Sequence, residues 1–269
     1  MAWWGKLIGG AFGFMLGGPL GALLGAVLGH QVDAVTGKGK KRYRIGDQER
    51  VQAAFFTATF SVMGYVAKAD GRVSQAEIAL AESIMAHMGL SPEQRRAAIR
   101  LFNNGKQPDF PLNDVLDQFR RECHHRHTLM QMFIEVQLQA AFADQRFDAA
   151  ESRVVRHIFE SLGFSREEFE YLVDMVRGTQ RYHDYYAGTE ARQPGVRPTL
   201  TDAYAVLGVP GSADDQKIKK AYRRLMSQHH PDKLVAKGLP EEMVTLAKEK
   251  VQEINRAYDQ IREARRELH

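Results

Sequence analysis

The 269-residue chain has a single cysteine, Cys123, so it cannot form an intramolecular disulfide. One free thiol is typical of a protein that works in a reducing compartment. The chain also has little net charge, because its 37 basic and 33 acidic residues leave a formal excess of +4. An excess this small and this widely spread does not indicate nucleic acid as a partner.

Long apolar runs are scarce too, and the one exception lies near the N-terminus. Residues Leu7 to Leu28 include no charged side chain, and as a helix they would measure about 33 Å, long enough to cross a bilayer. Five basic residues follow the run: Lys38, Lys40, Lys41, Arg42 and Arg44. The positive-inside rule therefore predicts a single-pass helix with its N-terminus outside the cell membrane and everything after residue 33 in the cytoplasm. A cleaved signal peptide is the alternative, but the run is overlong for one and has no clear cleavage site before His30.

Glycines recur at every fourth residue along this segment. On a helix this spacing forms one nearly straight groove, into which a second helix backbone fits closely. Small residues are common in membrane helices in any case, yet seven in one register favour self-association. We therefore predict a homodimer whose transmembrane face consists of Gly5, Gly9, Gly13, Gly17, Gly21, Gly25 and Gly29.

From residue 51 to about residue 177 the chain has helical periodicity and contains an internal repeat. Ala69–Glu77 aligns without a gap on Ala143–Glu151, an offset of 74 residues. Gly89 and Gly163 suit the position that follows a helix end. Two such copies predict a helical bundle. Four pairs have the spacing of an N-terminal capping box: Ser74/Glu77, Ser91/Gln94, Asp148/Glu151 and Ser165/Glu168.

Two groups of side chains in this region invite a metal interpretation. Carboxylate pairs, Asp70/Glu77 and Asp144/Glu151, offer the oxygens that hard cations prefer, but the glutamates already serve in caps. The run Cys123-His124-His125-Arg126-His127 has zinc-ligating residue types, yet consecutive residues of a helix point in different directions. We predict no metal site and no cofactor, while cation binding by the carboxylate pairs stays open.

The sequence around Pro231 defines the C-terminal region. Proline lacks a backbone N–H and disfavours the helical conformation of the preceding residue. The helix that contains Ala221–His229 should therefore stop at about His230. The residues His230, Pro231 and Asp232 would then form a stiff, exposed corner that holds an imidazole near a carboxylate.

Helical patterns lie on both sides of this corner. Ser212 and Asp215 give the preceding helix a start that resembles a capping box, and Ile218 and Leu225 belong to its apolar stripe. Its remaining faces are basic, with Lys217, Lys219, Lys220, Arg223 and Arg224. A short apolar helix ending at Gly208 comes before it, and the segment 239–242 opens a second long helix after it. The pattern predicts an antiparallel helical hairpin.

Four segments in this order, DAYAVLGV, IKKAYRRL, HHPDK and VQEINRAYD, closely resemble the J domain of Hsp40 (DnaJ-type) co-chaperones. In that family the His-Pro-Asp loop and the basic helix before it dock onto an Hsp70 and stimulate its ATP hydrolysis. The resemblance implies an Hsp70-binding site formed by His230, Pro231, Asp232 and Lys233 with the five basic residues of the helix. No nucleophile or phosphate-binding loop accompanies the corner, so we predict that the chain modulates an ATPase and is not an enzyme.

The repeat region is similar to the TerB-like (tellurite-resistance) helical domain, and the whole chain resembles the DjlA-type family of membrane-anchored J proteins. The resemblance implies an all-α protein of the bacterial inner membrane that acts on the Hsp70 DnaK, with a role in envelope-stress or capsule-related signalling. The alternative is a membrane-bound sensor of metals or oxyanions that carries an accessory J domain. The expected parts are a transmembrane anchor (1–32), a basic linker (33–50), a TerB-like domain (51–178), a linker (179–200) and a J domain (201–269).

Overall fold

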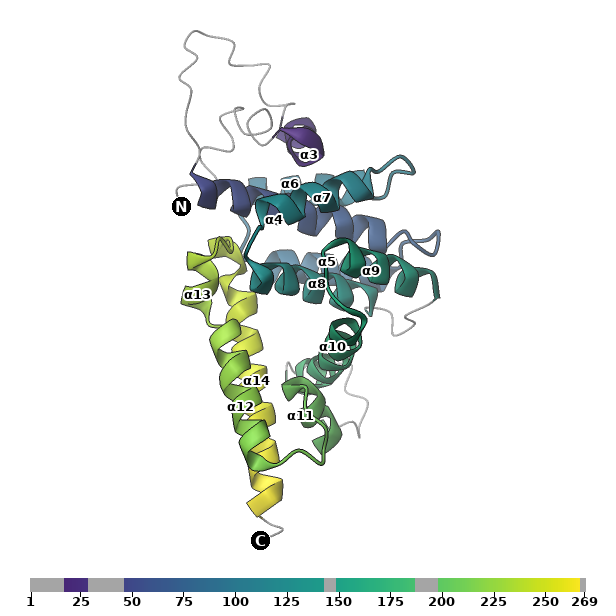
Figure 1. Ribbon diagram of the computed structural model, residues 1–269. Helices are drawn as coiled ribbons and strands as arrows, with labels where there is room; N and C mark the ends of the chain where they lie inside the picture. Colours follow the sequence, from purple (N-terminus) through teal and green to yellow (C-terminus); the bar gives the residue numbers. More distant parts are fainter. Residues whose placement is uncertain (1–16, 29–45, 143–148, 187–197, 267–269) are drawn as a thin grey trace. The chain divides into compact units, whose positions relative to one another are not determined.

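The computed structural model describes residues 17–28, 46–142, 149–186 and 198–266 of the chain (Figure 1). Within these ranges all regular secondary structure is helical, which confirms the predicted all-α class. Contacts divide the chain into two compact units. Unit 1 comprises Met1–Gly163 with Lys237–Met243, and unit 2 comprises Phe164–Ala236 with Val244–His269.

Unit 1 is built around helix α4. The side chains of α4 are buried continuously from Val51 to Gly64, so this helix forms the centre of the bundle. The rings of Phe55, Phe119 and Phe133 meet there, with centroids 4.5 Å apart for Phe119 and Phe133 and 6.0 Å apart for Phe55 and Phe119. The described helices of this unit are α3 (Gly18–Leu28), α4 (Asp47–Val66), α5 (Gln75–His87), α6 (Pro92–Gly105), α7 (Leu112–Glu122), α8 (His127–Ala141) and α9 (Ala149–Ser161).

Helices α4 and α6 touch through their backbones. A Cβ atom on Gly64 would overlap with the carbonyl oxygen of Phe102, and a Cβ atom on Gly105 would overlap with that of Ser61. Only residues without a side chain allow the two helices to approach this closely. The glycine pair therefore fixes the crossing of α4 and α6.

The repeat predicted from the sequence is present in the helices. Helices α5 and α9 have 13 residues each and start 74 residues apart. The boxes at Ser74/Glu77, Ser91/Gln94 and Ser165/Glu168 are formed, with both reciprocal hydrogen bonds in each. Gly89 and Gly163 have φ angles of 58° and 83°, which confirms their positions after helix ends. Asp148 lies outside the described residues.

The N-terminal segment differs from the single uninterrupted helix predicted for Leu7–Leu28. Helix α3 begins at Gly18, and Gly17 before it has a left-handed φ of 59°. Pro19 explains the start, because proline suits the first helical turn and restricts the residue before it. Leu20 and Leu24 are fully buried in unit 1, where α3 contacts α4, α6 and α7. The predicted glycine face is thus interrupted at Gly17, and its members Gly5, Gly9, Gly13 and Gly29 lie outside the described residues.

Gln118 of α7 fastens the start of α3. Its Nε2 donates to the carbonyl oxygen of Gly17 at 2.8 Å, and its Oε1 accepts from the backbone N–H of Leu20 at 2.8 Å. The bond from Leu20 satisfies a backbone N–H that a helix start otherwise leaves unpaired. In the part of the chain that the structure describes, none of the helices combines the length and the apolar character needed to cross a membrane.

Unit 2 contains α10 (Arg166–Tyr186), α11 (Leu200–Leu207), α12 (Asp215–Gln228), α13 (Pro231–Ala236) and α14 (Val244–Arg266). Helices α12 and α14 lie side by side as the predicted antiparallel pair, and α11 packs on both α10 and α14 (Figure 1). The rings of Tyr222 and Tyr258 stack between the two helices with their centroids 4.1 Å apart, and the Tyr222 hydroxyl donates to Asn255 Oδ1 at 2.9 Å. Helix α11 ends at Gly208 in the left-handed conformation, as predicted.

Three local expectations for this region need correction. Asp214, not Ser212, caps α12, because its carboxylate accepts the backbone N–H of Lys217. Pro231 opens the short helix α13 rather than a loop, and a 3-10 turn (Glu241–Met243) then leads into α14. Helix α10 continues to Tyr186, so the segment expected to be a linker from residue 179 starts as helix.

Candidate functional site

The corner formed by His230, Pro231 and Asp232 lies between α12 and α13, and Pro231 determines where one helix ends and the next begins. Helix α12 ends at Gln228, and the backbone N–H of His229 makes the last helical bond, to Leu225 at 2.9 Å. Pro231 then occupies the first position of α13, where its missing N–H costs no hydrogen bond. His230 is thereby held between two helices, which confirms the predicted end of α12.

Two adjacent histidines have opposite environments at this corner. His229 is buried, with 1% of its surface exposed. The side chain of His230 is 50% exposed and that of Asp232 is 92% exposed, with His230 Nδ1 and Asp232 Oδ2 4.0 Å apart. This separation is at the outer limit of an ion pair, so both groups remain available to a partner. The arrangement suits docking of another protein's surface.

The basic face of α12 leads up to this corner. Its members Lys217, Lys219, Lys220, Arg223 and Arg224 are all exposed. Lys217 pairs with Asp214 at 3.5 Å. The N–H of Lys217 also lowers the pKa of Asp214 by hydrogen bonding to its carboxylate. Beyond the corner, Lys233 Nζ donates to Ser227 Oγ at 2.6 Å, so this lysine braces the end of α12 against α13.

Arg265 near the end of α14 was not singled out from the sequence. Its Nη1 pairs with Asp215 at 2.6 Å, its Nε donates to the Tyr204 hydroxyl at 3.0 Å, and its Nη2 donates to the Ala213 carbonyl at 2.5 Å. The Tyr204 hydrogen bond is the main cause that raises the pKa of Arg265. One guanidinium thus ties α14 to the loop before α12 and occupies Asp215. In the sequence Arg265 is one of several charged residues near the C-terminus, and nothing in that pattern indicates a contact with a residue 50 positions away.

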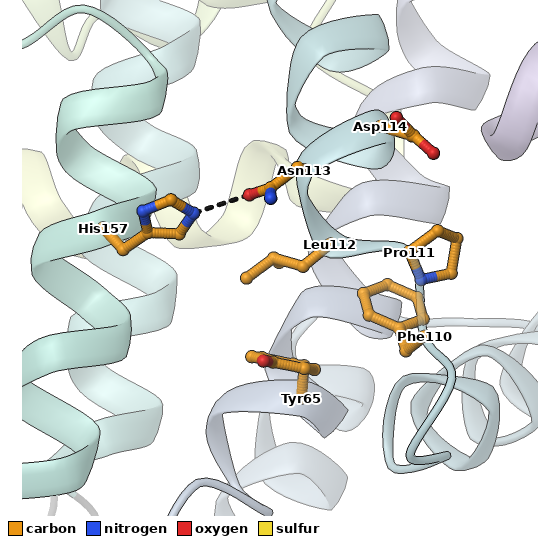
Figure 2. A pocket seen from close by; sticks show the side chains of 7 residues that line it. All are labelled: Tyr65, Phe110, Pro111, Leu112, Asn113, Asp114 and His157. Carbon is orange, nitrogen blue, oxygen red and sulfur yellow. Dashed lines mark hydrogen bonds between the residues drawn. The ribbon is translucent and has the colours of Figure 1, made fainter.

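A separate pocket of about 360 Å³ lies in unit 1 (Figure 2). The rings of Tyr65 and Phe110 form one side, with centroids 5.7 Å apart. On another side, Nε2 of His157 and Oδ1 of Asn113 lie 2.6 Å apart, joining α9 to α7. Sequence reasoning missed this pocket because its residues come from three separate helices and one loop.

The described residues give the metal alternative no geometric support. They contain no group of three His, Cys, Asp or Glu side chains that could hold an ion. Asp70 Oδ1 accepts the backbone N–H of Arg72 at 2.7 Å, and Glu77 belongs to its capping box. Cys123 is buried, which raises the pKa of its thiol. Asp144 lies outside the described ranges.

The family models that match divide the chain into three parts. They are the co-chaperone DjlA transmembrane domain over residues 1–44, the tellurite resistance protein TerB over residues 56–173, and the DnaJ domain over residues 202–268. The first indicates a membrane protein, and the last implies an Hsp70 partner. No solved structure matches the chain.

Full-length relatives give the same result. A protein of Photorhabdus laumondii named co-chaperone protein DjlA is 44% identical over 270 residues, which cover 97% of this chain and 98% of that protein. Proteins with this name from Shewanella oneidensis and Escherichia coli are 42% and 43% identical, and the match covers 98% of this chain in both cases and 99% and 98% of those proteins. With a DjlA membrane domain, a TerB domain and a DnaJ domain in the same order, the chain belongs to the DjlA family of co-chaperones.

Proposed function

We propose that this co-chaperone recruits the Hsp70 DnaK and stimulates its ATP hydrolysis through His230, Pro231 and Asp232. The observation that supports this proposal is the exposure of His230 and Asp232 on both sides of Pro231, at the end of a helix with five exposed basic side chains. The rest of the corner is held in place by buried residues, including His229 and Leu234. The contact groups are therefore free to bind while their backbone is fixed.

The site acts on its partner and performs no bond chemistry of its own. The basic face of α12 would attract an acidic surface on the ATPase and orient it during the encounter. The corner would then make the short-range contacts. A fixed corner loses little conformational freedom on binding, which favours docking.

The N-terminal segment would anchor the protein in the bacterial inner membrane. The five basic residues between positions 38 and 44 favour a cytoplasmic location for everything that follows. This orientation, with the N-terminus in the periplasm, places the J domain where ATP is present. Homodimer formation through the glycine face stays a prediction.

The TerB-like domain would bring a client or signalling protein to the recruited Hsp70. Its pocket between Tyr65, Phe110 and His157 offers one place for such a contact. Envelope-stress or capsule-related signalling is the pathway we expect from the family.

The test uses the full-length protein in detergent with DnaK that has been loaded with ATP. His230→Gln should return the single-turnover hydrolysis rate to its basal value, because it removes the imidazole and leaves Pro231 and both helices in place. The matched control is His124→Gln, an exposed histidine of unit 1, which should stimulate like the parent. A His230→Gln variant with undiminished stimulation would show that the site assignment is wrong.

A further inference from the structure

Helix α10 is an addition to the helical hairpin of unit 2, and it is attached to that unit over several turns. At Gly178 its backbone lies so close to α11 that a Cβ atom would be 3.0 Å from the Asp202 carbonyl oxygen and 3.2 Å from Val206. One residue later, Thr179 Oγ1 accepts a hydrogen bond of 3.0 Å from Lys250 of α14. Thr179 and Lys250 are both buried, so this bond is shielded from water and costly to break.

The internal repeat shows how α10 differs from its counterpart α6. At the 74-residue offset, the buried residues Leu172, Met175 and Val176 correspond to Ala98, Leu101 and Phe102 of α6. The apolar face is therefore shared by both copies.

Two other positions depart from the first copy. Gly105, which lets α6 touch α4, corresponds to Thr179, the partner of Lys250. Ala97 corresponds to Tyr171, so the second copy has a large aromatic ring where the first has a methyl group. Gly105 of the bundle contact and the small, buried Ala97 of the first copy thus have counterparts in the second copy that contact the J domain.

The ring of Tyr171 lies against two features of the J domain. It covers Gly208, where a Cβ atom would overlap with the ring carbon Cε2. Gly208 is thus constrained both by its left-handed φ of 61° and by the tyrosine above it. The second feature is Arg224, whose guanidinium carbon is 5.9 Å from the centroid of the Tyr171 ring, within cation–π range.

Arg224 is one of the five basic residues of the α12 face, and it stays exposed despite the contact. A free arginine side chain has many rotamers and loses them on binding. A ring fixed by α10 restricts the guanidinium beforehand without covering it. The contact therefore orients the Arg224 side chain and leaves it accessible to a partner.

We propose that Tyr171 is a positioning residue that orients Arg224 for docking onto the Hsp70, so that the last helix of the TerB repeat tunes the J domain. This inference rests on the proposed function. It predicts that Tyr171 affects the concentration of co-chaperone needed for stimulation, whereas the corner at His230 sets the maximal rate.

The experiment titrates full-length protein in detergent against DnaK and measures half-maximal and maximal ATPase stimulation. Tyr171→Leu should raise the half-maximal concentration about two- to fivefold, the range expected for one exposed cation–π contact, with maximal stimulation retained. Tyr171→Phe keeps the ring and should behave like the parent. In an Arg224→Gln background, Tyr171→Leu should have no further effect, whereas in an Arg223→Gln background its full effect should persist.

Three results would overturn the proposal: equal effects of Tyr171→Leu in both backgrounds, a loss in Tyr171→Phe that matches Tyr171→Leu, or tighter docking after Tyr171→Leu. The last would mean that the ring masks Arg224. Failure of the parent to stimulate DnaK would instead refute the proposed function. NMR of the Arg224 Nε–H group, assigned by its loss in Arg224→Gln, then still decides the contact: Tyr171→Leu should remove a ring-current shift, and an unchanged signal would refute the contact itself.

Discussion

Reversing two charges on α12 is the most informative perturbation of the proposed docking face. The segment from Asp214 to Gln228 has five basic and two acidic residues, a net charge of +3. Lys220→Glu with Arg223→Glu changes this net charge to −1. Both side chains are exposed, and the cation–π contact with Tyr171 belongs to Arg224, so the helix and that contact should survive.

The expected effect is on the association rate. Electrostatic steering raises association rates by roughly 10- to 1,000-fold. Changing the net charge of the α12 face from positive to negative should remove this gain in rate. At 0.1 M salt, where charges act over about 10 Å, we expect association with DnaK to slow about tenfold or more. At 0.5 M salt the range falls to about 4 Å, and the difference from the parent should shrink to about threefold or less.

Stopped-flow binding at the two salt concentrations measures this directly. The matched control is Arg96→Glu with Arg121→Glu, which makes the same change in net charge at exposed positions of α6 and α7. The control should associate at nearly the parent rate. Equal slowing in the control, or a loss that is the same at both salt concentrations, would refute the idea that the α12 face steers docking.

Two further predictions concern the bundle and the membrane. Gly105→Ala should lower the free energy of unfolding by about 1–3 kcal/mol, because the new methyl group overlaps with the Ser61 carbonyl; urea denaturation should show this loss, while the exposed Asn103→Ala on the same helix should show none. A phosphatase that is active only in the periplasm should be inactive when fused after residue 45, and an active fusion would reverse the proposed orientation.

Local signals in the sequence predicted much of the bundle. Ser74/Glu77 and Ser91/Gln94 form their boxes because a capping box depends only on residues three positions apart. Gly89 has its positive φ for an equally local reason. Gly17 and Pro19 also indicate the break before α3, but the uncharged run around them favoured the prediction of one uninterrupted helix.

Contacts between distant segments were not predictable in this way. Gly64 and Gly105 look like ordinary helix glycines until α4 and α6 are brought together. The apolar face of α10 indicates that the helix is buried, but it does not say that α11 is the partner. Such pairings depend on tertiary packing, which periodicity alone does not specify.

The candidate site was predictable to a similar degree. Pro231 dictates the end of α12, so the exposed corner followed from one residue type. Arg265 was missed because its partners, Asp215 and Tyr204, lie 50 or more residues away. Tyr171 was missed because it belongs to a different domain of the sequence.

Site-specific photo-crosslinking shows whether the corner at His230, Pro231 and Asp232 docks onto DnaK. A photoreactive amino acid at Lys233, next to the corner, should crosslink to DnaK in inside-out membrane vesicles when ATP is present. The same probe at Asp259, exposed on α14, serves as the control and should give little product. We expect an ATP-dependent crosslink from position 233 that is lost when His230→Gln is added. Equal crosslinking from both positions, or none from position 233 in vesicles that expose the cytoplasmic face, would contradict it.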